Sequence, residues 1–171
     1  MKKISFIAIL FFVTIILYIF FVSLNSKKVY DTSELIGKPI SKIDLNLLNK
    51  NGKFNTEDFS KNNFTLINFF SSWCGPCRKE HKFLMQLSKN KDMKIFGINF
   101  KDKKSNANEF LNKLGNPYYL IAADSTGKKS ISFGVYGIPE TILINKDLII
   151  VKKYIGPIDQ NDVKEILKEI K

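Results

Sequence analysis

The chain has 171 residues, enough for one globular domain and an additional segment. Its 27 basic and 16 acidic residues give a formal net charge of +11. Such a charge suits attraction to an anionic membrane surface or an acidic partner, or simply a lysine-rich solvated surface. We favour the solvated surface because the lysines are scattered. No basic cluster interleaved with aromatic residues indicates nucleic-acid binding, and the sequence has no internal repeat and no glycine-rich phosphate loop.

The N-terminus carries an uncharged, strongly apolar run from Ile4 to Leu24, directly after Met1-Lys2-Lys3. As a helix rising about 1.5 Å per residue, this run would span roughly 31 Å, enough for the hydrocarbon core of a membrane. A cleavable signal peptide is the alternative, but its apolar region would be about 7–15 residues long and would end at a small-x-small site. Residues 22–26 offer no good site of this kind. We therefore predict a transmembrane signal anchor over residues 1–24.

The charges around this anchor do not decide its orientation. The lysines at 2–3 favour a cytoplasmic N-terminus, whereas the lysines at 27–28 favour the opposite. After the anchor, residues 25–34 are predicted to form a polar linker, and residues 35–171 the folded domain.

The domain is predicted to open with a β-hairpin. Ile43, Leu45 and Leu47 alternate with polar residues, which is typical of a strand. Asn49-Lys-Asn-Gly52 is a turn signal, and Phe54 begins a short return strand.

A more apolar strand follows over Leu66–Phe70, and it contains Asn68, whose buried side chain would need a hydrogen-bond partner. The later patterns predict these elements in order: a helix after Cys77, a strand over 94–100, a helix capped by Ser105 and ending at Leu114, a strand over 118–122, a weak helix over 126–133, strands over 141–144 and 148–154, and an amphipathic helix over 160–170. This order predicts an α/β fold with a mixed central sheet flanked by helices.

The strand at 66–70 leads into Cys74 and Cys77, the only cysteines of the chain. A strand, a C-x-x-C pair and a helix in succession are typical of a thiol–disulfide redox site. At the start of a helix, Cys74 would face unpaired backbone N–H groups and the positive end of the helix dipole, which lower a thiol pKa below about 8.5. Cys77 would lie on the same helix face, close enough to form a disulfide, and Pro76 suits the first helical turn.

Other interpretations of the cysteine pair fit less well. A purely structural disulfide over so short a loop would constrain little of the unfolded chain. A metal site needs three or four ligands, and the chain has one histidine, His81, and no second C-x-x-C. Haem attachment would need a histidine after Cys77, where Arg78 stands.

Several motifs resemble known families. Trp73-Cys-Gly-Pro-Cys77 resembles the redox motif of the thioredoxin superfamily, and Ile138-Pro139 falls where those proteins carry a cis-proline loop. The run from Phe133 to Thr141, Phe-Gly-Val-Tyr-Gly-Ile-Pro-Glu-Thr, together with Phe96–Asp102 and Leu114–Tyr118, resembles more narrowly the TlpA/ResA-like DsbE/CcmG family. The resemblance covers the chain from about residue 35. It implies a thioredoxin-like fold with an N-terminal β-hairpin and a central insertion, preceded by one transmembrane helix.

Members of that family are membrane-anchored thiol:disulfide interchange proteins of cytochrome c biogenesis. The resemblance therefore implies a single-pass protein of the bacterial inner membrane whose catalytic domain faces the periplasm. It implies reduction of the haem-binding C-x-x-C-H cysteines of apocytochrome c, or of a maturation component that carries them. Electrons would come from a DsbD- or CcdA-like membrane donor, and no cofactor or metal is expected.

Each reactive residue has an expected role. Cys74 is expected to be the exposed nucleophile, and Cys77 the shielded thiol that resolves the mixed disulfide. Trp73 would shape the rim of the site.

Two other functions stay open on the same pattern: a thiol oxidant or isomerase, and a non-enzymatic module that holds apocytochrome or metal. The Gly75-Pro76 pair resembles reducing thioredoxins, near −270 mV, more than oxidants near −120 mV.

The loop that carries Pro139 is the expected substrate-binding element, together with Tyr136. A cis Pro139 would present the backbone of Ile138 to an extended substrate segment, whereas an ordinary trans turn is the alternative.

Proton transfer at Cys77 needs a titrating group, because Asn68 stands where thioredoxins usually carry a buried Asp. Glu80, three residues beyond Cys77 on the helix, is the first candidate, and a solvated glutamate is its alternative. Glu140 is the second candidate, and its alternative is a loop carboxylate without a role.

Overall fold

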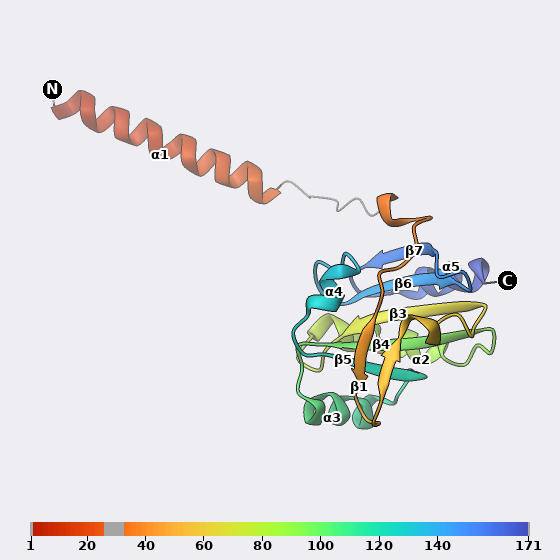
Figure 1. Cartoon of the computed structure of the whole chain (residues 1–171). Helices are drawn as coiled ribbons and strands as arrows, with labels where there is room; N and C mark the ends of the chain where they lie inside the picture. The colour runs from red at the N-terminus through yellow and green to blue at the C-terminus, as the bar shows by residue number, and fades with distance from the viewer. Residues whose placement is uncertain (1, 26–32, 171) are drawn as a thin grey trace. The chain divides into compact units, whose positions relative to one another are not determined.

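The computed structural model describes residues 2–25 and 33–170, and the chain divides into two units, residues 1–31 and 32–171 (Figure 1). The first unit contains helix α1, Lys2–Asn25, whose described side chains are exposed. Over Phe6–Asn25 this helix is, by length and composition, long and apolar enough to cross a membrane. The predicted apolar helix is therefore confirmed.

The predicted linker coincides only partly with the described residues. Residues 26–32, including the lysines at 27–28, lie outside them. Asn25 ends α1, and a short 3₁₀ helix, η1 (Ser33–Leu35), precedes the first strand of the second unit.

The second unit is an α/β structure that contains one seven-stranded sheet. Its further elements are, in chain order, β1 (Asp44–Leu47), β2 (Lys53–Asn55), the 3₁₀ helix η2 (Thr56–Asp58), β3 (Phe64–Phe70), α2 (Gly75–Leu87), β4 (Met93–Phe100), α3 (Lys104–Leu114), β5 (Leu120–Asp124), α4 (Lys128–Ser132), β6 (Glu140–Asn145), β7 (Ile150–Ile155) and α5 (Gln160–Glu169). The strand order is β2-β1-β5-β4-β3-β6-β7. The predicted fold class and the N-terminal hairpin of β1 and β2 are confirmed.

Strands β3 and β4 lie inside the sheet and pair in parallel, from Phe64 opposite Met93 to Phe70 opposite Asn99. Both are buried along most of their length, as expected for parallel strands that are covered on both faces. Strand β5 continues the parallel group, and β6 pairs with β3 in the antiparallel direction. Because β3 and β4 run the same way, their carboxyl ends meet at one edge of the sheet, where the C-x-x-C motif begins.

The two faces of the sheet enter separate hydrophobic cores. On one face, Leu66 and Phe70 of β3 pack with apolar residues of α2, α3 and α5. On the other face, Ile67 and Phe69 pack with residues of the hairpin, with Phe59 after η2 and with the segment that follows α4. Side chains alternate along a strand, so each residue near the motif belongs to one face or the other.

Several predicted boundaries were wrong. Strand β7 begins at Ile150 instead of Leu148, and Leu148 has a positive φ of 63°. Ser105 does not cap α3, because the helix begins one residue earlier and Lys103 takes the cap position without a side-chain bond. Strand β5 begins at Leu120 instead of Tyr118. The side chain of Asn116 accepts the Tyr118 N–H, so this N–H is not available to a neighbouring strand.

Candidate active site

Cys74 and Cys77 are joined by a disulfide at the start of α2, as the spacing predicted. Cys74 is the N-cap residue, and its Sγ accepts the backbone N–H of Cys77 at 3.1 Å. Pro76 stands in the first turn, where its missing N–H costs no helical hydrogen bond. The sulfur of Cys74 therefore lies against the unpaired N–H groups that stabilise a thiolate.

The expected difference in exposure between the two cysteines was wrong for the disulfide form. Cys74 is only 4% exposed and Cys77 2% exposed. The neighbouring Trp73 is 59% exposed, so the aromatic ring, not the sulfur, forms the rim of the site. The Nε1 of Trp73 donates to the carbonyl of Lys101 at 3.1 Å.

Asp102 fastens the loop in front of the cysteines, and sequence reasoning missed it. Its carboxylate accepts the Ser72 N–H at 2.7 Å and the Ser72 hydroxyl at 2.8 Å, and also bonds from Asn99 and the Lys103 N–H. Burial raises the pKa of Asp102, but these hydrogen bonds outweigh it, and the pKa lies below its usual value. Asp102 follows the end of β4, which pairs in parallel with β3. Recognising this pairing from the sequence would have placed Asp102 beside the C-x-x-C motif.

The Ile138–Pro139 peptide bond is cis, which confirms the predicted cis-proline loop. The Ile138 carbonyl oxygen lies 3.7 Å from the Sγ of Cys74. In the disulfide that sulfur has no proton, so the approach is a contact and not a hydrogen bond. Tyr136, two residues earlier, is 71% exposed. The loop and Trp73 thus provide the exposed surroundings of the redox pair.

Asn68 finds its hydrogen-bond partners on the face of the sheet that α2 covers. Its amide nitrogen donates to Glu80 Oε1 at 2.9 Å and to Thr141 Oγ1 at 3.0 Å, and its oxygen accepts the Tyr118 hydroxyl at 2.8 Å. Burial raises the pKa of Tyr118 well above its usual value, and the negative charge of Glu80 raises it further. The tyrosine therefore stays a neutral donor in this network.

Glu80 is completely buried, which excludes the alternative of a solvated helix glutamate. Its second oxygen, Oε2, accepts the backbone N–H of Ile158 at 2.9 Å. Burial raises the pKa of Glu80 to about 7, although the bonds from Ile158 and Asn68 act in the other direction. A carboxyl that titrates near neutral pH thus lies one helical turn beyond Cys77.

Glu140 does not join Glu80 behind the cysteines. Along β6, Thr141 and Leu143 face α2, whereas Ile142 enters the opposite core, so Glu140 belongs to that opposite face. The side chain is buried, and its Oε2 lies 2.7 Å from Lys153 Nζ. Glu140 is therefore a buried strand residue and not a loop carboxylate. Its position does not favour the expected second role in proton transfer at Cys77, which stays a prediction.

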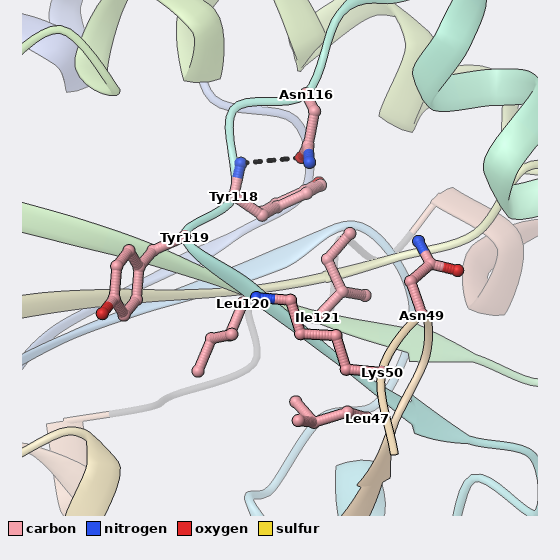
Figure 2. Close-up of a pocket in the computed structure, with 8 residues that line it drawn as sticks. All are labelled: Leu47, Asn49, Lys50, Asn116, Tyr118, Tyr119, Leu120 and Ile121. Carbon is pink, nitrogen blue, oxygen red and sulfur yellow. Dashed lines mark hydrogen bonds between the residues drawn. The ribbon is translucent and has the colours of Figure 1, made fainter. Parts of the chain in front are cut away.

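Two hollows lie near these residues. The first, of about 340 Å³, is lined by Trp73, Arg78 and residues of α3. The second, of about 90 Å³, is shown in Figure 2, where Tyr118 and Ile121 lie across from Leu47 of the hairpin. Ordinary ligand pockets measure about 300–1,000 Å³, so only the first hollow falls within that range.

His81 does not belong to a cluster of metal ligands. Its Nε2 lies 2.9 Å from the Gly115 carbonyl, and burial lowers its pKa. Within residues 2–25 and 33–170, no three side chains of His, Cys, Asp or Glu gather where they could hold a metal ion.

An α/β fold with a mixed sheet, a redox pair at a helix N-terminus and a cis-proline loop beside the Cys74 sulfur together define a thioredoxin-fold thiol–disulfide oxidoreductase. The comparisons with known proteins agree with this class. Residues 35–170 match the Redoxin family. A DsbF homologue from Corynebacterium diphtheriae has a similar structure, with a TM-score of 0.68 and 23% identity over 82% of this chain and 90% of that one.

Sequence relatives narrow the assignment. Thiol:disulfide interchange protein DsbE of Pseudomonas aeruginosa is 41% identical over 135 residues, which are 79% of this chain and 74% of that protein. Thiol:disulfide interchange protein CycY of Rhizobium leguminosarum bv. viciae is 46% identical over 110 residues, which are 64% of this chain but only 59% of that protein. The chain belongs to the DsbE thiol:disulfide interchange proteins of the Redoxin family.

Proposed function

We propose that the protein is a membrane-anchored, periplasmic disulfide reductase that acts on apocytochrome c, or on a maturation partner, during cytochrome c biogenesis. The observation that supports thiol–disulfide exchange most directly is the contact between Cys74 Sγ and the Cys77 N–H at the start of α2, which favours a reactive Cys74 thiolate. The reducing direction rests on the Gly75-Pro76 pair, which resembles that of reducing thioredoxins. The substrate assignment rests on the family resemblance, since a C-x-x-C-H disulfide is the substrate that the resemblance implies. The anchor would be α1, with residues 1–24 as the transmembrane segment and 35–171 as the catalytic domain.

The reaction starts from the dithiol form. The Cys74 thiolate attacks one sulfur of the substrate disulfide, the substrate S–S bond breaks, and the other substrate sulfur leaves as a thiolate. The Cys77 thiolate then attacks Cys74 Sγ, which releases the second substrate sulfur. The substrate gains two electrons and two protons, and the protein becomes the Cys74–Cys77 disulfide described above. A DsbD- or CcdA-like membrane donor would reduce this disulfide again.

Glu80 is the group we assign to proton transfer at Cys77. A carboxyl with a pKa of about 7 can both accept and release a proton at neutral pH. Asn68 cannot titrate in this range, but it holds Glu80 Oε1 and so orients the carboxyl. Glu140 has no part in this step, because Lys153 engages it on the other face of the sheet.

Substrate binding is assigned to Trp73 and to the cis-proline loop. Exposed rings of Trp73 and Tyr136 would contact the segment around the substrate cysteines. The Ile138 carbonyl, held by the cis bond to Pro139 beside Cys74 Sγ, would accept a backbone N–H from that segment.

The redox potential tests the direction of the reaction. Because a reductant must lose electrons readily, we expect a potential nearer to −270 mV than to −120 mV in a glutathione or dithiothreitol titration of the domain. A value above about −150 mV would instead support the oxidant or isomerase alternative.

Topology tests the anchor. A periplasmic reporter fused after Lys28 should be active, and the intact mass of the purified protein should include residues 1–24, because the apolar run lacks a good cleavage site. Either a mature protein that starts near Asn25 or an active cytoplasmic reporter would contradict this prediction.

A further inference from the structure

Lys153 on β7 is a buried lysine beside the cis-proline loop. It is 7% exposed overall, and its side chain has no exposed area. Among the residues whose burial the structure describes, it is the only buried lysine. No sequence pattern distinguishes it from Lys152, which precedes it on the same strand.

The ammonium group of Lys153 contacts three parts of one short segment. Its Nζ lies 2.7 Å from Glu140 Oε2, an ion pair without the alignment of a hydrogen bond, and it donates to the Gly134 carbonyl. It also lies 5.5 Å from the centre of the Tyr136 ring, within the range of a cation–π interaction. One buried cation thus contacts both the start of β6 and the loop that precedes it.

Glu140 carries the restraint further along the loop. Its Oε1 accepts the backbone N–H of Tyr136 at 2.8 Å and that of Gly137 at 3.1 Å. Pro139, the residue immediately before Glu140, has the cis bond that brings the Ile138 carbonyl to Cys74. The ion pair therefore restrains the backbone on both sides of the expected substrate-binding residues.

Stability alone does not account for such a pair. A buried ion pair loses its hydration, and replacing both charges by apolar side chains is often neutral or stabilising. A buried charge pair has a clearer use where it fixes one arrangement of the backbone. Here the restrained backbone carries Tyr136, whose ring is 71% exposed beside the redox pair.

We propose that Lys153 is a positioning residue for substrate binding. Through Glu140 and Gly134 it holds residues 134–137 so that the Tyr136 ring and the Ile138 carbonyl meet an extended disulfide substrate. The proposal rests on the function proposed above and adds a residue that acts on substrate affinity without touching the sulfurs. Because Lys153 lies on the face of the sheet opposite Glu80, we expect its removal to leave proton transfer at Cys77 unchanged.

The test compares two substrates on the full-length protein in detergent micelles, with dithiothreitol as the regenerating reductant. An oxidised C-x-x-C-H peptide needs the loop, whereas hydroxyethyl disulfide is too small to use it. In Lys153→Met we expect the KM for the peptide to rise roughly tenfold, since small displacements of a binding element have large effects. The kcat for the peptide, the rate with hydroxyethyl disulfide and the pKa of Cys74 should stay at wild-type values.

A second variant separates positioning from the effect of an unpaired buried charge. Lys153→Met leaves Glu140 without its cation, so that variant can lose stability for this reason alone. The double variant Lys153→Met/Glu140→Gln has no unpaired charge, and the Gln oxygen can still accept the Tyr136 and Gly137 N–H groups. We expect its KM for the peptide to stay raised, because Gly134 and the Tyr136 ring have lost the cation. If Lys153→Met does not fold, the KM of the double variant for the peptide decides whether Lys153 has the positioning role.

Lys152→Met is the matched control. Lys152 is the preceding residue on β7, points to the other face and pairs with Glu165 of α5, where both side chains are partly exposed. This variant should keep the wild-type KM for the peptide.

The outcomes distinguish the two proposals. A wild-type KM in the double variant, or an equal loss with both substrates, would overturn the positioning role of Lys153. If wild-type protein reduces the C-x-x-C-H peptide no better than a peptide with the same residues in scrambled order, the proposed substrate is wrong, whatever Lys153 does.

Discussion

Cys77→Ser is expected to accumulate a mixed disulfide between Cys74 and its substrate. The first attack needs only Cys74, which retains its place at the helix N-cap. Release then depends on external thiol at millimolar concentration instead of a neighbour held at a far higher effective concentration. We therefore expect the mixed disulfide to decay at least ~1,000-fold more slowly than in wild type. Stopped-flow mixing with an oxidised C-x-x-C-H peptide, followed by mass spectrometry, measures both formation and decay.

Cys74→Ser is the matched control for this trap, because it keeps Cys77 but removes the expected nucleophile. It should form no adduct. An adduct of similar yield on Cys77 would reverse the assigned roles. The control is needed because the two cysteines are nearly equally buried in the disulfide form. The same Cys77→Ser variant, expressed in cells, would identify the natural substrate through the protein linked to Cys74.

Local patterns were sufficient for most of the fold. The alternation in β1, the apolar run of β3 and the amphipathic pattern of α5 each depend on residues close in sequence, and each element was found near its predicted place. The Cys74 cap and the cis-proline were also predictable, because both are carried by short motifs. Residues that one motif contains need no knowledge of the sheet order.

The parts that were not predicted depend on pairing between distant strands. Asp102 reaches Ser72 only because β3 and β4 are parallel neighbours, and Lys153 reaches Glu140 only because β6 and β7 form a hairpin with a particular register. Glu140 illustrates the limit most clearly. Its sequence position beside Pro139 suggested a place near the sulfurs, but one residue of strand alternation turns its side chain to the opposite face.

Glu80→Gln is expected to change both thiol chemistry and the pH dependence of stability. The substitution keeps the shape of the side chain and the acceptor for Asn68 or Ile158, but it removes the negative charge and the titrating proton. Without the like charge, the pKa of Cys77 should fall in the dithiol form. Reduction of a C-x-x-C-H peptide should slow by about 10–100-fold, since proton transfer loses its donor and acceptor. Thiol titration by NMR and stopped-flow kinetics measure these effects.

The stability of the oxidised domain gives an independent readout, because disulfide cysteines do not titrate. Glu80 has a folded-state pKa of about 7 against an ordinary value of 4.5, so between these pH values the folded state holds a proton that the unfolded state has released. The free energy of unfolding should therefore fall as pH rises from about 4.5 to about 7, by at most about 3 kcal/mol. Urea titrations across this range should show the fall in wild type and in the exposed-residue control Glu169→Gln, but not in Glu80→Gln.

A wild-type rate and an unchanged pH profile in Glu80→Gln would mean that the buried carboxyl is structural. Proton transfer at Cys77 would then need a group other than Glu80, and Glu140 is held by Lys153 on the other face of the sheet.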